Sequence, residues 1–269
     1  MMLKLSTVRK HAIAATDGTI GMVSDFLFDD VSWTIRWLVV DTGNWLSGRK
    51  VLLPPSVLGH AMPADKTFPV RLTLAQIEAS PVLEEHRPVS RQFEVSTYDH
   101  YGWSPYWGGG YYLGGYGLLG GNMMMGVDPA QRRNEEFDRL RHERDEPHLR
   151  SAEEVTGYHI HASDGQIGHL SDLVLNDDDW SIRYLVVDTS NWWIGHKVLI
   201  SPRSAHSIQW SESLINLDID RQKVKDSPPW DPALPLDRAH EKLMAGHYAK
   251  ADPDPAPDPL AKPLDPVWR

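Results

Sequence analysis

Residues 33–42 read WTIRWLVVDT, and residues 180–189 read WSIRYLVVDT. The second stretch follows the first by 147 positions, and only two of the ten residues differ. The same offset aligns residues 17–56 with residues 164–203 without a gap, and 22 of these 40 positions are identical. One register held over so long a segment indicates an internal duplication. The chain therefore carries two copies of one unit.

The first copy shows the residue patterns of short β-strands. Alternation of apolar and polar residues predicts a strand over residues 20–29. It would place Met22, Phe26 and Phe28 on one face and Val23 and Leu27 on the other. Residues 29–32 (DDVS) have the composition of a turn. Residues 34–41 are apolar, β-branched and aromatic, which is typical of a strand buried on both faces.

Two further short strands are expected at residues 50–53 and 70–72. Short strands separated by turns predict a small β-barrel or a curled sheet in each copy. One short helix should follow, because Thr73 can cap its first turn with Gln76 as the capping-box partner. In the second copy Asp220 stands at the capping position.

In each copy DGxIG precedes IR(W/Y)LVVDT, and GxKVL follows. The order of these motifs resembles that of the PRC-barrel family. The sequences YGWSPYW at residues 101–107 and SPPWDP at residues 227–232 are similar to those of tandem PRC-barrel proteins of bacteria. The resemblance covers residues 1–107 and 151–248, and it implies small β-barrels with a role in binding. The family is named for the cytoplasmic domain of the photosynthetic reaction-centre H subunit, whose membrane helix is not matched here.

We therefore expect a mainly β chain with two small PRC-type β-barrels in tandem, each followed by short helical segments. The expected layout is module 1 at residues 1–101, a linker and charged helix at 102–150, module 2 at 151–248 and a disordered tail at 249–269. Duplicated units often derive from a symmetric dimer, so the modules should form a pseudo-twofold pair. We place their contact on the equivalent segments 80–101 and 227–248.

The segment between the copies has an unusual composition. Residues 101–127 contain ten glycines and no charged residue. Glycine and tyrosine supply little transfer energy to a bilayer, so we expect a flexible linker or contact strip and no membrane span. Asp128 and Pro129 then predict the start of a solvated helix. The four Asp-Pro pairs after residue 251 predict an extended, disordered tail.

Composition narrows the classes of function. A formal net charge of −10 disfavours nucleic-acid binding, which depends on Lys and Arg. The chain has no cysteine, which excludes disulfides, thiolate metal sites and a cysteine nucleophile. Residues 1–17 lack the continuous apolar core of a signal peptide, so a cytoplasmic location is expected.

The polar motifs do not predict an enzyme. Asp41 and Asp188 end the apolar strand in each copy and are expected to cap the following loop. Residues 176–179 (NDDD) lack the glycine and distal glutamate of a calcium loop, so a hairpin turn is expected. Four histidines of the second copy suggest imidazole ligands, but the first copy has no histidine at the matching positions. These four are His159, His161, His169 and His196. No catalytic, cofactor-binding or metal site is therefore expected, and no cofactor.

The loops after the apolar strands are the best candidates for contact with a partner. They carry Asn44 and Trp45 in the first copy and Asn191, Trp192 and Trp193 in the second. Tryptophan is enriched at interface hot spots. The alternative is that these rings close one end of their own barrel or pack between the two barrels.

Three functions follow as hypotheses. The first is a non-enzymatic scaffold that binds a protein partner, with a second copy of the chain among the candidates. The alternative is a membrane-peripheral component associated with reaction-centre or other electron-transfer complexes, which touches the membrane without spanning it. The third is a metal-dependent enzyme built on the histidines of the second copy.

Overall fold

A computed structural model describes residues 1–46, 48–62, 64–81, 91–103, 149–189, 196–231, 236 and 238–248. In the first copy the elements are β1 (Met2–Lys4), α1 (Leu5–Val8), β2 (Ala12–Ala15), β3 (Gly18–Asp29), β4 (Thr34–Asp41), β5 (Lys50–Leu53), η1 (Pro55–Val57), β6 (Thr67–Pro69), α2 (Leu74–Glu78) and α3 (Arg91–Tyr101). In the second copy they are β7 (Leu149–Ser151), α5 (Ala152–Val155), β8 (His159–Ala162), β9 (Gly165–Asn176), β10 (Ser181–Asp188), β11 (Lys197–Ile200), η3 (Pro202–Ser204), β12 (Ala205–Gln209), η4 (Trp210–Glu212), β13 (Leu214–Leu217), α6 (Arg221–Lys225) and α7 (Arg238–Tyr248). The predicted charged helix and Asp-Pro tail lie outside the described residues.

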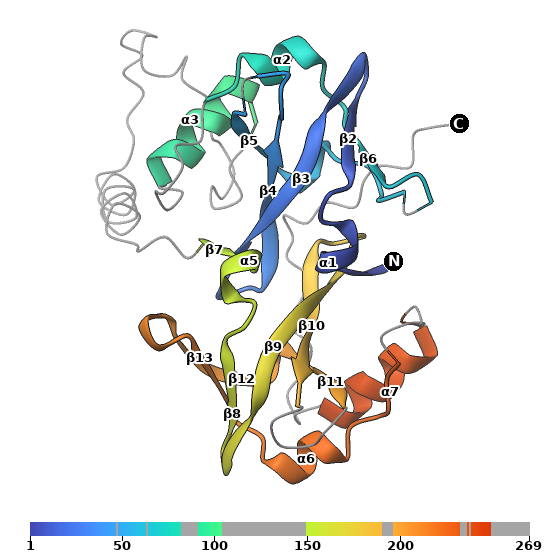
Figure 1. Cartoon of the computed structure of the whole chain (residues 1–269), viewed down its shortest axis with the longest axis vertical. Coiled ribbons are helices and arrows are strands. Elements are labelled where there is room, and N and C mark those ends of the chain that lie inside the picture. Colours follow the sequence, from blue (N-terminus) through green and yellow to red (C-terminus); the bar gives the residue numbers. More distant parts are fainter. Residues whose placement is uncertain are drawn as a thin grey trace, which may run out of the picture.

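The described strands form one large mixed sheet that does not close on itself. Its main path runs in the order β12-β13-β8-β9-β10-β4-β3-β2-β6, and β1, β5, β7 and β11 pair at its sides. β13 pairs with β8 and β6 with β2 in parallel, whereas the long central pairs are antiparallel. Figure 1 shows the first copy above and the second below. The predicted mainly β class is confirmed.

The central apolar strand is buried on both faces, as its composition predicts. In β4, Ile35, Leu38 and Val40 belong to the main core. Trp37 and Val39 belong to a second core on the other face. The turn that precedes β4 is the expected one at residues 29–32, because the Asp29 carboxylate accepts hydrogen bonds from the N–H groups of Val31 and Ser32 at 3.0 and 2.8 Å.

The predicted alternation along β3 is wrong at Met22, whose side chain is 53% exposed. The ladder between β3 and β4 shifts register between Val23 and Asp25. Such a bulge inserts one residue and changes which face the following side chains occupy. Val23 and Phe26 therefore both reach the main core, and Met22 points to solvent.

The strand expected at residues 70–72 lies earlier in the chain. β6 covers Thr67–Pro69 and pairs in parallel with β2. Val70 forms only an isolated bridge with Leu58. A three-residue edge strand has little periodicity to read, and its position is set here by the partner strand.

The structure explains why the DGxIG motif ends in glycine and begins with aspartate. A Cβ on Gly21 would lie 2.0 Å from the backbone oxygen of Asp41, and one on Gly168 would lie 1.9 Å from that of Asp188. The final glycine thus lets the long hairpin strands approach closely. At the other end, Asp17 Oδ1 accepts a hydrogen bond from the N–H of Leu74 at 2.8 Å, which ties the β2–β3 turn to helix α2.

The predicted helix caps are confirmed in both copies. The Thr73 hydroxyl accepts from the N–H of Gln76, and the Gln76 side chain accepts from the N–H of Thr73 at 2.9 Å. Asp220 accepts from the N–H of Lys223 at 2.7 Å at the start of α6. Local capping chemistry therefore fixes these short helices where the sequence places them.

The two copies meet through reciprocal backbone hydrogen bonds. The N–H of Ile182 donates to the oxygen of Trp33 at 2.7 Å, and the N–H of Ile35 donates to the oxygen of Trp180 at 2.8 Å. These four residues are two equivalent pairs under the 147-residue offset. β4 and β10 begin side by side at this point and run apart (Figure 1).

Next to this contact, the copies exchange their first strands. β1 pairs with β9 of the second copy, and β7 pairs with β3 of the first. The registers correspond, because Met2 lies opposite Asn176 and Leu149 lies opposite Asp29. Each copy thus completes the sheet of the other.

The short helices that follow the exchanged strands are capped from across the junction. The N–H of Ser6 donates to Asp172 Oδ1 at 3.1 Å, and the N–H of Glu153 donates to Asp25 Oδ1 at 3.0 Å. Burial raises the pKa of Asp25, and the hydrogen bond from the Ser151 hydroxyl opposes this shift.

The contact between the copies is not where we expected it. The described part of segment 80–101 packs on its own copy, where Glu94 accepts from the Trp37 indole N–H at 2.7 Å and Tyr98 lies against the same ring. In segment 227–248, Met244 of α7 is buried against the strands of the second copy. Figure 1 shows α3 and α7 on opposite sides of the molecule. The amphipathic helices cover the outer faces of the sheet, so the exchanged strands form the junction.

A cut between the copies should not separate them. With a specific protease site inserted within residues 104–148, both fragments should co-elute in size exclusion after cleavage and separate only in denaturant. Each fragment keeps one strand in the other's sheet, which supports association. Separate elution under native conditions would contradict the exchange.

Gly21→Ala should lower the free energy of unfolding by about 1–3 kcal/mol, because the new methyl group overlaps the backbone of β4. Gly246→Ala is the matched control: it lies in helix α7 with no heavy atom within 4 Å of the added Cβ, so it should stabilise by about 0.5–1 kcal/mol. Urea unfolding of both variants measures the difference, and equal effects would refute the close-approach role.

Candidate functional site

The loop after β4 holds an exposed tryptophan on a fixed backbone. Asp41 Oδ1 accepts from the N–H of Gly43 at 2.8 Å, which confirms the predicted capping role. The Thr42 hydroxyl donates to the oxygen of Arg49 at 2.7 Å and closes the loop. Asn44 is exposed, and Trp45 is 37% exposed. Asn191, Trp192 and Trp193 lie outside the described residues.

The loop is also tied to the rest of its copy. The Arg49 guanidinium donates to the oxygen of Glu78 at 2.9 Å and to the oxygen of Ser80, at the end of α2. The Trp45 ring makes no ring contact with another described residue. Part of the ring is therefore presented outward, and the described neighbours do not bury it.

The four histidines of the second copy do not come together. His159 and His169 are cross-strand neighbours on β8 and β9, and His161 lies two residues along β8. Nδ1 of His159 is 3.3 Å from the Gln166 amide nitrogen. No group of three metal-ligating side chains forms from these histidines in the described ranges.

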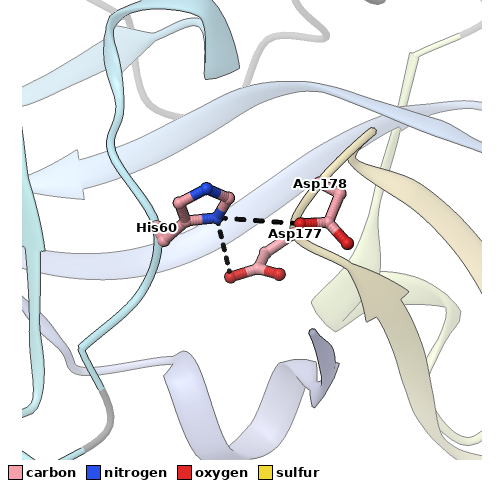
Figure 2. Close-up of side chains that lie close together, drawn as sticks. All are labelled: His60, Asp177 and Asp178. Atoms are coloured by element: carbon pink, nitrogen blue, oxygen red, sulfur yellow. Dashed lines mark ion pairs between the residues drawn. The ribbon is translucent and has the colours of Figure 1, made fainter. Parts of the chain in front are cut away.

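A different polar cluster forms where the copies meet, and the sequence analysis missed it. The turn at residues 176–179 is a hairpin turn as predicted, with the Asn176 side chain accepting from the N–H of Asp178 at 3.2 Å. His60, from the first copy, points at this turn (Figure 2). Its Nδ1 lies 3.4 Å from Asp177 Oδ2 and 4.0 Å from Asp178 Oδ1.

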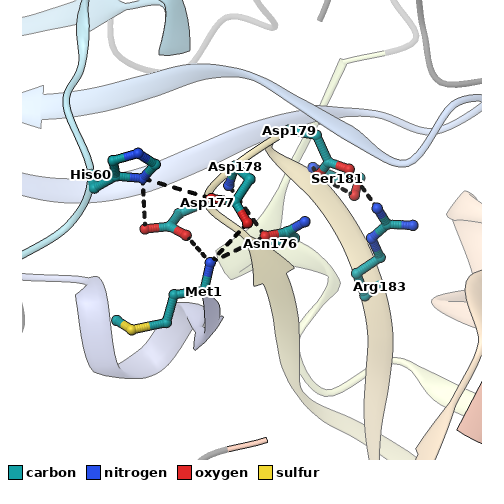
Figure 3. Close-up of polar contacts among 8 residues, drawn as sticks. All are labelled: Met1, His60, Asn176, Asp177, Asp178, Asp179, Ser181 and Arg183. Atoms are coloured by element: carbon teal, nitrogen blue, oxygen red, sulfur yellow. Dashed lines mark hydrogen bonds and ion pairs between the residues drawn. The ribbon is translucent and has the colours of Figure 1, made fainter. Parts of the chain in front are cut away.

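The amino group of Met1 lies on the other side of the same carboxylates (Figure 3). It donates to Asp177 Oδ1, to Asp178 Oδ2 at 3.2 Å and to Asn176 Oδ1 at 3.3 Å. Burial lowers the pKa of this amino group, but the hydrogen bonds to the two aspartates outweigh it and raise the pKa overall. The turn therefore acts as a cation-binding group of oxygens.

Asp177 is the fixed member of this cluster. Its side chain is 2% exposed, whereas those of His60 and Asp178 are 59% and 65% exposed. A buried carboxylate needs positive charge or donors around it. Asp177 obtains them from Met1 and His60, and no Lys or Arg side chain pairs with it among the described residues.

In the first copy the aspartate equivalent to Asp177 is neutralised by an arginine. Asp30 corresponds to Asp177, and its Oδ2 accepts from Nε of Arg150 at 3.0 Å. The Arg150 guanidinium also stacks over the Trp210 ring, 4.0 Å from its centroid. The permanently charged guanidinium and its aromatic platform make this a structural contact between the copies.

A small cavity of about 210 Å³ adjoins this contact. It is lined by Asp30, Trp33, Ala205, His206, Ser207, Ile208 and Trp210. Pockets that enclose a small-molecule substrate usually have volumes of about 300–1,000 Å³. This cavity is below that range and belongs to the junction.

The Asp30–Arg150 contact should be worth more than an exposed ion pair. In a double-mutant cycle with Asp30→Asn and Arg150→Met, urea unfolding should give a coupling free energy of about 0.5–3 kcal/mol. The exposed pair Asp179–Arg183 is the control and should give about 0–1 kcal/mol. Equal coupling in the two cycles would contradict the structural role of Arg150.

In the part of the chain that the structure describes, no helix has the length and apolar character needed to cross a bilayer.

Comparison with known proteins does not assign the chain to a family. No protein-family model matches the chain, and no curated protein matches it significantly.

Proposed function

We propose that this chain is a non-enzymatic tandem PRC-barrel scaffold that binds a protein partner through the loops after β4 and β10. The proposal takes its family from the DGxIG, IR(W/Y)LVVDT and GxKVL motifs. Two small PRC-type barrels and the pseudo-twofold relation of the two modules are part of the proposal, and the reciprocal strand exchange supports that relation. The observation that carries the binding role is the outward-facing Trp45.

A tryptophan on a hydrogen-bonded loop suits recognition. Trp45 supplies a large apolar surface, and its loop is held by the contacts of Asp41, Thr42 and Arg49. Binding costs less conformational entropy when the contact loop is ordered beforehand. Hot-spot residues at protein interfaces are enriched in tryptophan for the area they bury.

The duplication supports a bridging role. β4 and β10 begin next to each other at Thr34 and Ser181 and end at Asp41 and Asp188. The loop that follows β4 and the segment that follows β10 therefore start at opposite ends of the molecule (Figure 1). One chain could in this way hold two partner molecules, or two sites of one partner.

Trp45→Ala should weaken partner capture strongly and change the melting temperature little. Loss of a hot-spot ring costs about 2 kcal/mol or more of binding free energy, which is a loss in affinity of more than tenfold. The measurement is affinity capture by the full chain from lysate of its native organism, with identification by mass spectrometry and thermal melting of each variant.

Leu243→Ala provides the control, because Leu243 is 61% exposed on α7, which packs on the second copy, whereas Trp45 lies in the first copy. It should capture the same proteins as the unmodified chain. A large loss of thermal stability in Trp45→Ala would show that the ring is core. Capture that is unchanged by Trp45→Ala, or recovery of membranes in place of a protein, would refute the proposed interface.

A further inference from the structure

We propose that His60, Asp177 and Asp178 form a binding site for a divalent transition-metal ion of the zinc class, at the junction of the two copies. The three side chains offer one imidazole nitrogen and two carboxylate oxygens, and these ligand atoms all lie within 4.8 Å of one another. The inference is independent of the proposed scaffold function.

The spacing is close to that of a metal site. A tetrahedral ion with bonds of about 2.1 Å separates its ligand atoms by about 3.4 Å. Nδ1 of His60 lies 3.4 Å from Asp177 Oδ2, and its 4.0 Å distance to Asp178 Oδ1 needs only a small closure. His60 and Asp178 are mostly exposed and can make that adjustment, whereas Asp177 is buried and sets the position.

Hydrogen bonds from Met1 orient the carboxylates of Asp177 and Asp178 toward His60. Met1 binds one oxygen of Asp177 and one of Asp178, which leaves the other oxygen of each directed at His60 (Figure 3). Hydrogen bonds to the distal oxygen of a ligating carboxylate fix its orientation and are typical of metal sites. The amino group also shows that this turn already accommodates a cation at its oxygens.

Comparison of Asp177 with its equivalent in the first copy distinguishes a structural contact from a set of metal ligands. Under the 147-residue offset, Asp30 and Val31 of the first copy correspond to Asp177 and Asp178. Ser207 of the second copy corresponds to His60. Asp30 is neutralised by Arg150, and the residue equivalent to Arg150 beside Asp177 is the apolar Leu3. Around Asp177 the Met1 amino group supplies the positive charge that Arg150 supplies to Asp30. The imidazole of His60 and the carboxylate of Asp178 are additional to that pairing, and both are metal-ligating groups.

The ligand types select the ion. One imidazole with two carboxylates is a mixed nitrogen and oxygen set, which suits Zn²⁺, Co²⁺ or Mn²⁺. Ca²⁺ and Mg²⁺ prefer oxygen ligands alone and gain little from an imidazole. Water would complete the coordination, since three protein side chains are available.

A bound ion would join the two copies directly. His60 lies in the first copy, between η1 and β6, and the aspartates lie in the β9–β10 turn of the second. An ion that binds the folded chain and not the unfolded chain raises the melting temperature in proportion to the logarithm of its concentration. The proposed site therefore predicts a zinc-dependent melting temperature.

The test is titration of untagged, EDTA-treated full-length protein with Zn²⁺ by calorimetry, with Co²⁺ absorption as a second readout. One ion should bind per chain, and Zn²⁺ should raise the melting temperature. His60→Ala and Asp178→Asn should each weaken binding at least about tenfold and abolish the thermal shift. Both residues are mostly exposed and Met1 still pairs with Asp177 in each variant, so the metal-free variants should melt close to the unmodified protein.

The matched control is the double variant His159→Ala with His161→Ala, which removes two histidines elsewhere in the second copy. It should bind Zn²⁺ as the unmodified protein does. Absence of binding, binding unchanged by His60→Ala, loss of binding in the control, or equal affinity for Mg²⁺ and Zn²⁺ would each overturn the proposal.

Discussion

The arrangement of the molecule depends on two backbone hydrogen bonds between the copies, at Trp33 and Trp180. Both tryptophans have left-handed backbone conformations, with φ of 53° and 57°. Bulky residues avoid this region, so the surrounding structure must hold them there. It does so through their rings, which pack on Phe28 and Phe68, and through their carbonyls, which accept from Ile182 and Ile35. The turn then starts β4 and β10 side by side. The strand exchange follows, because β1 and β7 reach the opposite hairpin only when the two hairpins meet at this point.

Duplication gives this junction two similar contacts that need not stay identical. Each hairpin turn buries one aspartate against the other copy, Asp30 at 10% and Asp177 at 2% exposure. In one contact Arg150 neutralises the charge and stacks on Trp210, which is sufficient for cohesion. The other contact carries the Met1 amino group, an imidazole and a second carboxylate, and it is the proposed ion site. A symmetric dimer of single units could not make this distinction, because both contacts would carry the same residues.

The sequence predicts the local features well, because their causes lie within a few residues. The capping box of Thr73, the turn at Asp29 and the doubly buried strand at residues 34–41 depend on near neighbours. Features set by distant chain segments were missed: the bulge that exposes Met22, the position of β6, the strand exchange, and the approach of His60 to Asp177. The repeat shows which residues are equivalent. It does not show which strand of one copy pairs with the other, since that depends on the paired geometry.

The same constraint connects the proposed loops with the proposed ion. The loop after β4 and the segment after β10 start at the far ends of two strands that are joined at their beginnings, so their separation is set by the angle at the junction. Two linked binding sites gain affinity only if the distance between them matches the distance between the two sites on the partner. A stiff connection between the sites makes that requirement stricter. His60 and Asp177 come from different copies and meet at the junction. An ion there would add one more link between the copies to the hydrogen bonds at Trp33 and Trp180, the exchanged strands and the Asp30–Arg150 contact. The observed junction, the proposed ion site and the separation of the two proposed binding loops therefore all depend on one duplicated turn.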